Sequence, residues 1–312
     1  MRHASALLRT VTVCAGLLFV LLALAFPGWN ALLAPWVVLA AVFLIGIPHG
    51  AIDHVMAAEL YRLHATLKDY LLFYGGYLIL MLLVGALWYF LPVGGMILFL
   101  SISIYHFGQA DMEDFLRVDG GGPLPAPVWH VVRGLLIIGL IVFSDSGVTY
   151  PILAEAMRIP EAGLDSILPV PAYGIAVVTG PYVLAAIASL AAGQIVRPWH
   201  FLLDSLLLGL VLVVSGPLTG FALYFALWHS AGHIREMQRF FRSRGKRLTL
   251  PAFYWKAAPF TLVSLAGLAL LAGINRAFGL EEQFLSLMFI LISVLTLPHM
   301  VIVDRMYRET YA

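Results

Sequence analysis

Residues 70–91 read YLLFYGGYLILMLLVGALWYFL, and this stretch, which contains no charged residue, decides the fold class. An α-helix needs about 20 apolar residues to cross the hydrocarbon core of a bilayer. A strand of a membrane barrel would instead alternate apolar and polar residues over about ten positions. The stretch therefore predicts a transmembrane helix.

Similar apolar runs recur along the whole chain. Its 312 residues are 62% hydrophobic and only 11% charged, which leaves too little polar surface for a water-soluble domain. We therefore predict one all-α domain over residues 1–312, a polytopic transmembrane helix bundle of about ten spans, with eight to ten as the range. The predicted spans lie near 11–27, 31–48, 70–91, 94–110, 130–145, 172–194, 200–216, 218–235, 257–275 and 283–303.

The positions of Lys and Arg predict the orientation of the spans, because basic residues concentrate on the cytoplasmic side. With the N-terminus inside, 16 of the 18 basic residues face inward, Arg133 among them, and only Arg158 and Arg276 face outward. The run 11–27 is followed by no A-x-A cleavage motif and is interpreted as a span. These patterns predict a multi-pass protein of the cell (inner, cytoplasmic) membrane with both termini in the cytoplasm.

Composition also excludes some classes of function. The net charge is +1 and no basic face carries interleaved aromatics, so no nucleic-acid partner is expected. The one cysteine, Cys14, lies in an apolar run, which excludes a disulfide framework and a thiolate metal cluster. The basic segment 235–256 is expected to be a cytoplasmic loop beside anionic lipid.

Histidines are the chemical signal of this sequence. Ionisable residues inside spans are costly and mark function more often than chance. On the predicted topology, four separate spans carry histidines at one depth, toward their inner ends, which predicts a metal site. The five histidines concerned are His49, His106, His229, His233 and His299, whereas His54, His130 and His200 lie at span ends or in loops, where solvated histidines are ordinary.

The pair His229 and His233 has the spacing of two ligands of one metal. Residues four apart lie about one turn apart on the same face of an α-helix. The small residues between them, 230–232, would let a neighbouring helix or a substrate approach closely.

Carboxylates follow the histidines in three of these segments. An acid near a metal-bound histidine commonly accepts its second ring N–H and fixes its orientation. Asp53, one turn after His49, is the strongest candidate for this role. The other two acids, each five residues after a histidine, are Asp111 after His106 and Asp304 after His299.

The choice of metal follows from the ligand set. Imidazole suits zinc, copper, iron and nickel alike. Zinc with four protein ligands is normally closed and structural, and a structural ion is hard to motivate in a lipid-embedded bundle. Four neutral histidines around iron would leave open positions for oxygen, so iron is favoured.

The motifs PHGAID (48–53), YHFG (105–108), WHSAGH (228–233) and PHMVIVD (298–304), in this order, resemble those of the Brp/Blh family of bacterial and archaeal β-carotene 15,15′-dioxygenases. The resemblance extends from His49 to Asp304. It implies a ferrous iron, Fe(2+), bound by His49, His106, His229 and His233, with O2 as co-substrate.

The activity that the resemblance implies is oxygen-dependent cleavage of the central double bond of β-carotene to two retinals. The carotenoid would enter from the lipid, and a retinal-binding rhodopsin is a candidate product acceptor. In this interpretation Asp53 orients a ligand, and His299 belongs to the second shell or the substrate pocket. Four aromatic residues adjoin the ligands in sequence and are candidates to line the polyene tunnel: Tyr105, Phe107, Tyr224 and Trp228. The alternative is that they only pack against other helices or face lipid.

Other functions compete with this interpretation. Membrane di-iron desaturases use HxxxH and HxxHH boxes, and this sequence has HxxxH once and HxxHH nowhere. A zinc hydrolase would need HExxH, whereas Glu236 follows the histidine pair. A metal transporter would spread its histidines over several depths. Cleavage of another carotenoid, and a non-catalytic role in retinal delivery, remain as alternatives.

Overall fold

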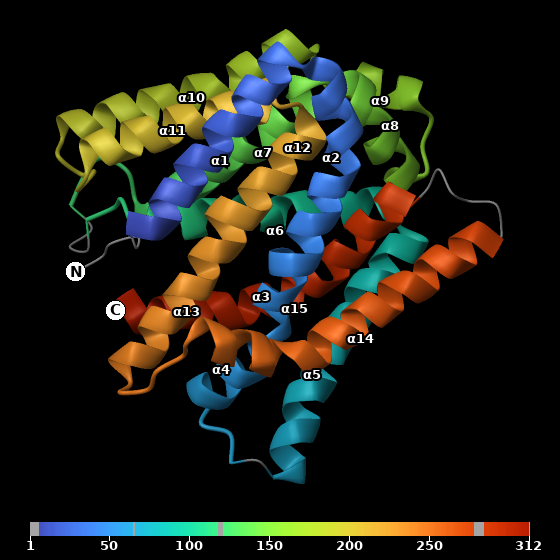
Figure 1. The fold of residues 1–312 in the computed structure, drawn as a ribbon, viewed down its shortest axis with the longest axis vertical. Helices are drawn as coiled ribbons and strands as arrows, with labels where there is room; N and C mark the ends of the chain where they lie inside the picture. Colours follow the sequence, from blue (N-terminus) through green and yellow to red (C-terminus); the bar gives the residue numbers. More distant parts are fainter. Residues whose placement is uncertain (1–5, 65, 118–120, 278–283, 312) are drawn as a thin grey trace. The chain divides into compact units, whose positions relative to one another are not determined.

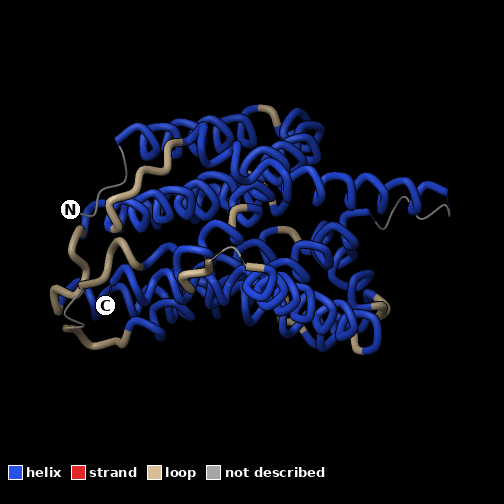
Figure 2. The backbone as a smooth tube through the Cα atoms, turned by 90° about the horizontal axis from the view of Figure 1, so that it is seen from below, coloured by secondary structure: helices blue, strands red, loops and turns tan. Residues whose placement is uncertain are grey.

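The structure, a computed structural model, describes residues 6–64, 66–117, 121–277 and 284–311. Helices joined by short loops make up nearly all of the described chain (Figures 1 and 2). It divides into two compact units, which are described separately below. The first unit comprises residues 1–45, 103–151 and 161–233, and the second comprises residues 46–102, 152–160 and 234–312.

In the first unit, α7 is the central helix and packs against α10, α11 and α12. The helix α1 packs against α2 and α11, and α2 packs against α12 (Figure 1). Trp129 on α7 donates from Nε1 to Ser189 Oγ on α10 at 3.1 Å, so this contact includes a buried hydrogen bond. The helices are α1 (Ala6–Ala25), α2 (Pro27–Ala41), α7 (Ala126–Ser144), α8 (Ser146–Met157), α9 (Glu161–Ile167), α10 (Pro171–Ala191), α11 (Pro198–Val214), α12 (Pro217–Leu223) and the π-helix η2 (Tyr224–Ser230).

In the second unit, α15 packs against α4, α5 and α14, and α14 also packs against α3. Trp88 on α5 donates from Nε1 to Ser293 Oγ on α15 at 2.9 Å. The chain passes between the units within η1, α6, α8 and α13 and in the connection from α8 to α9. The expectation of a single domain stays a prediction. The remaining helices are the π-helix η1 (Val42–Gly46), α3 (Ile47–Ala51), α4 (Asp53–Leu60), α5 (Leu67–Phe90), α6 (Pro92–Met112), α13 (Ala231–Ser243), α14 (Leu250–Ala277) and α15 (Phe284–Tyr311).

Proline sets the start of several helices. Its missing N–H is not needed in the first turn, and its fixed φ suits the helix. Five helices have proline as their first residue: α2, α6, α10, α11 and α12. The helix boundaries are therefore encoded locally, between apolar runs.

Two glycines allow α6 and α7 to approach closely within the first unit. A Cβ on Gly108 would lie 1.7 Å from the carbonyl oxygen of His130, and a Cβ on Gly134 would lie 1.7 Å from that of Ile104. Small residues at such crossings let backbones meet in membrane bundles. The crossing fixes the position of the α6 turn that carries His106.

The fold class predicted from sequence is confirmed. The described residues contain eight helices long and apolar enough to cross a membrane, and α11 is a shorter apolar helix. Large apolar side chains face outward, as on α5, where Leu72 is 65% exposed and Leu82 is 71% exposed. This inside-out distribution is expected for a protein whose surroundings are lipid. The exact number of spans and the cytoplasmic position of both termini stay predictions.

The segment between the predicted spans near 130–145 and 172–194 contains two helices, α8 and α9. Its first helix, α8, begins after Asp145, whose Oδ1 accepts from the backbone N–H of Gly147 at 3.1 Å. Thr149 Oγ1 donates to the carbonyl oxygen of Asp145 at 3.0 Å. These local hydrogen bonds stabilise a helix start that hydropathy alone does not indicate.

Candidate metal centre

Three histidines from separate segments meet in the first unit. His106 lies on α6, His229 near the end of η2, and His233 in the first turn of α13. Each is 1% exposed. Potential ligand atoms of all three lie within 4.8 Å of one another. The structure therefore brings three of the predicted ligands together, and their assignment as metal ligands stays a prediction.

The three imidazoles also have a compact mutual arrangement. The ring centroids of His106 and His229 are 4.8 Å apart, those of His106 and His233 are 5.0 Å apart, and those of His229 and His233 are 4.7 Å apart. A transition metal binds histidine nitrogens at about 2.0–2.1 Å. Small side-chain rotations would bring three nitrogens at this separation onto one ion.

A π-helix positions the first histidine of the pair. The segment η2 spans Tyr224–Ser230, so the wide turn ends between His229 and His233. π-helical turns are rare and occur mostly at functional sites, where they change the direction of a side chain. The spacing of four residues predicted that both imidazoles share a face, and the structure adds that the backbone between them is not a uniform α-helix.

Aromatic rings surround His229. Phe225 stacks on it, with centroids 5.7 Å apart and planes at 14°. Phe107, from α6, meets it edge-on at 4.7 Å. This apolar packing shields the donor atoms from water and suits a neutral imidazole that binds a cation.

In the second unit, Asp53 contacts His299, a residue far along the chain. The Asp53 oxygens lie 2.8 and 3.0 Å from Nδ1 of His299. Tyr77 donates from its hydroxyl to Asp53 Oδ2 at 3.0 Å. The Nδ1 atom of His49 contacts the carbonyl oxygen of Gly46. Asp53 thus orients a histidine, as metal-site carboxylates do, and Tyr77 is a member of the cluster that no sequence motif signalled.

His49 and His299 are neighbours within the second unit. Their ring centroids are 5.0 Å apart with an interplanar angle of 86°. Both residues are 6% exposed. The place of His49 among the metal ligands, and the role of His299 beside them, stay predictions.

The remaining candidates have more specific contacts than the sequence predicted. Tyr105 meets the ring of His130 edge-on at 5.4 Å. Phe107 packs on His229, and its ring is 5.2 Å from that of Tyr224. Tyr224 is fully buried and, like Trp228, donates a hydrogen bond to a carboxylate. None of these contacts tests the prediction that the four aromatics line a polyene tunnel.

The expectation that His130 is a solvated histidine is wrong. His130 is 3% exposed, with Nε2 3.6 Å from Glu113 Oε1, and is not a solvated histidine. Arg133 is 1% exposed and forms ion pairs inside the first unit. His130 and Arg133 lie near the start of α7, where hydropathy indicates the end of a span. Hydropathy does not show which neighbouring helices cover their side chains.

Asp304 has a surface partner. Its Oδ2 lies 2.8 Å from Nε of Arg308, whose side chain is largely exposed. Four residues separate this pair along α15, a spacing at which side chains on one helix meet.

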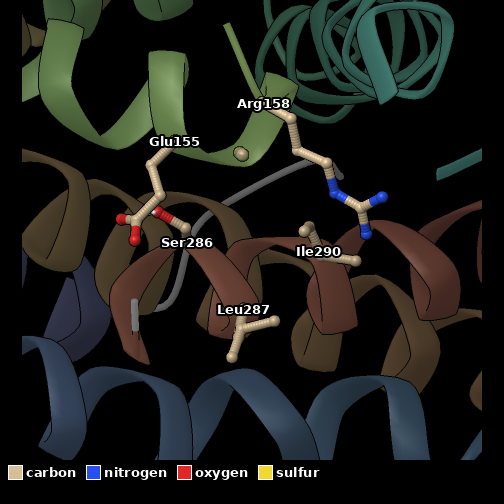
Figure 3. A pocket seen from close by; sticks show the side chains of 6 residues that line it. Glu155, Arg158, Ser286, Leu287 and Ile290 are labelled. Atoms are coloured by element: carbon tan, nitrogen blue, oxygen red, sulfur yellow. Dashed lines mark hydrogen bonds between the residues drawn. The ribbon is translucent and has the colours of Figure 1, made fainter. Parts of the chain in front are cut away.

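A hollow of about 280 Å³ lies in the second unit, away from the histidines named above (Figure 3). Glu155 lies on α8, and Arg158 follows the end of that helix. Both face Ser286 and Ile290 of α15 (Figure 3), and Ser286 Oγ donates to Glu155 Oε2 at 2.7 Å. A charged, hydrogen-bonded lining of this kind does not suit an apolar polyene. None of the histidines named above is among the residues that line the hollow.

Fold and site together define a polytopic membrane protein with a buried, imidazole-rich centre of the kind that binds a transition metal. Residues 40–307 match the family described as "Beta-carotene 15,15'-dioxygenase". The chain therefore belongs to this family, and it is a dioxygenase. The resemblance drawn from the four histidine motifs is confirmed.

Two relatives agree with the family match. The chain is 31% identical over 305 residues to "Probable beta-carotene 15,15'-dioxygenase Blh" of Halobacterium salinarum, covering 88% of this chain and 84% of that protein. It is 28% identical over 295 residues to "Beta-carotene 15,15'-dioxygenase" of an uncultured marine bacterium, 66A03, covering 89% of this chain and 95% of that protein. No solved structure matches the chain.

Proposed function

We propose that this protein cleaves the central 15,15′ double bond of β-carotene with O2 and releases two molecules of retinal. The observation that carries the proposal is the buried His106, His229 and His233 cluster in a chain that belongs to the dioxygenase family. The two relatives are named for this reaction and match nearly the whole chain.

The reaction balances without a further cofactor. The carbon–carbon double bond and the O–O bond break, and each new aldehyde receives one oxygen atom. No external reductant is consumed, so no flavin or nicotinamide site is required. The chain's own task is to place one double bond and exclude water.

The residues of the histidine cluster fit iron in the ferrous state. Imidazole nitrogens suit this metal, and three neutral ligands leave its positive charge uncompensated and positions open. Family resemblance assigns His49 as a further ligand. When bound, the iron supplies activation of O2. His106, His229 and His233 hold the ion, and Phe107 and Phe225 keep water from it.

The apolar exterior supports a lipid-soluble substrate. A carotenoid dissolves in the hydrocarbon core, against which the outward leucines of helices such as α5 would lie. Supply of substrate from the bilayer therefore needs no soluble carrier. The predicted rhodopsin acceptor for retinal finds no support in the relatives, and the inner cell membrane as location stays a prediction.

The decisive test is expression of the full chain in a β-carotene-producing bacterium. Loss of pigment with formation of retinal is the expected result. Under ¹⁸O2, both halves should carry one labelled oxygen when the aldehydes are reduced at once to alcohols, which stops exchange of their oxygen with water. Pigmented cells that contain inserted protein and form no retinal would refute the proposed substrate.

A matched pair of variants separates the site from general effects. His233→Ala removes a buried member of the cluster and should abolish both iron binding and cleavage. His200→Ala removes an exposed histidine at the start of α11 and should leave both intact. Turnover retained in inserted His233→Ala protein would contradict the ligand assignment.

A further inference from the structure

Arg133 is buried inside the first unit and uses all its nitrogens. Its Nε lies 3.0 Å from Asp111 Oδ2, and its Nη2 lies 2.8 Å from Asp204 Oδ2. Its Nη1 donates to Tyr182 Oη and to Ser205 Oγ, each at 3.0 Å. An ionised group inside a membrane bundle is costly and is retained where it has a specific task.

The two carboxylates that bind Arg133 each use their second oxygen for the same π-helix. Tyr224 donates from its hydroxyl to Asp111 Oδ1 at 3.3 Å. Trp228 donates from Nε1 to Asp204 Oδ1 at 2.9 Å. Both donors lie on η2, the segment that carries His229, and Trp228 immediately precedes that histidine. Arg133, Asp111 and Asp204 are called the clamp below.

The clamp connects the helices that carry the histidines. Asp111 and His106 lie on α6, so the hydrogen bond from Tyr224 ties the helix of one histidine to the segment of another. The ring of Phe107, also on α6, contacts η2, with its centroid 5.2 Å from that of Tyr224 and 4.7 Å from that of His229. The bond from Trp228 ties the same segment to α11.

A π-helical segment needs such support. Its hydrogen bonds span five residues, and the conformation is rare because an α-helix is normally more stable. If η2 became α-helical, the direction of every side chain after the change would rotate relative to α6. Contacts that hold both Tyr224 and Trp228 oppose this rearrangement.

We infer that the clamp is a positioning device, in which Arg133 fixes two carboxylates that in turn hold η2 so that His229 and His106 face one metal ion. The inference rests on the proposed function only in that the histidine cluster binds a metal. Arg133, Tyr224 and Trp228 touch neither metal nor oxygen in this role. They act through the histidines.

The test uses the full chain purified in detergent, loaded with cobalt(II) as a spectroscopic probe or with ferrous iron. Trp228→Phe and Tyr224→Phe each remove one donor atom and retain an aromatic ring. We expect about a tenfold or larger loss of metal affinity, as for other residues that orient metal ligands. The cobalt d–d absorption should also change, because it reports the arrangement of the ligands.

Trp129→Phe is the matched control. It removes an indole N–H that donates to Ser189 Oγ, a group outside the clamp, at a buried site in the same unit. It should lower the unfolding temperature without changing the cobalt spectrum or the metal affinity. Equal spectral changes in this control and in Trp228→Phe would show a merely structural effect and overturn the inference.

Other outcomes are equally informative. Wild-type metal affinity and spectrum in both folded variants, or a wild-type protein that binds no metal, would overturn the inference. Steady-state kinetics should show a lower kcat with little change in KM. If the cobalt readout responds as expected but no carotenoid is cleaved, the clamp stands and the proposed function fails, so the two failures can be told apart.

Discussion

The crossing of α6 and α7 gives the sharpest test of how packing controls the centre. Replacing Gly108 by alanine places a Cβ 1.7 Å from the carbonyl oxygen of His130, whereas real Cβ atoms essentially never approach closer than 3.0 Å. The obstacle is backbone, so no side-chain rotation relieves it. The two helices must move apart locally by at least the difference, 1.3 Å.

This displacement reaches the metal centre because His106 lies two residues before Gly108 on α6. A misplacement of about 1 Å at a reacting centre can lower the rate about 100-fold. Overpacking costs about 1–3 kcal/mol, and the better helix propensity of alanine offsets about 1 kcal/mol of it. Gly108→Ala should therefore insert with modest loss of stability but cleave about 100-fold more slowly.

The assay is retinal formed per inserted protein, with iron per chain measured on the purified variant. Gly134→Ala should behave alike, since its Cβ would meet the carbonyl oxygen of Ile104 at the same 1.7 Å. Gly209→Ala on α11 is the control, because a Cβ there meets nothing within 4 Å. Wild-type turnover in Gly108→Ala would refute the argument that this crossing fixes the position of His106.

Further predictions concern the second unit and the metal. Asp53→Asn removes the charge that binds His299 and Tyr77. Hydrogen bonds to charged groups contribute about 1.5–3 kcal/mol. The initial rate of retinal formation should therefore fall about tenfold or more. Tyr77→Phe should have a smaller effect of the same sign, and an unchanged Asp53→Asn rate would contradict both. Chelation should abolish activity, and ferrous iron but not zinc should restore it; recovery with zinc alone would argue against O2 activation by iron. Lys246→Ala loses an exposed pair with Glu59 and should change stability by less than about 1 kcal/mol in thermal unfolding.

The sequence by itself determined the fold class and much of the site. Hydropathy is a local sum, so runs such as 70–91 indicate helices whatever their neighbours, and the structure has α5 there at Leu67–Phe90. The motifs around His106, His229 and His233 predicted a shared centre, and the spacing of the last two placed them on one face. Local motifs suffice here because ligand chemistry restricts which residues can occupy such positions.

Only the tertiary structure decided which polar side chains pair. Arg133 looked like a basic residue at a span end, and Asp111 like an acid that follows a histidine, yet they bind each other and hold η2 through Tyr224. Asp53 similarly pairs with His299, far along the chain. Such pairs depend on how each helix is rotated and where it crosses its neighbours, and small residues such as Gly108 set that crossing. A sequence records the residues that can pair, but the packing of the helices selects the partners.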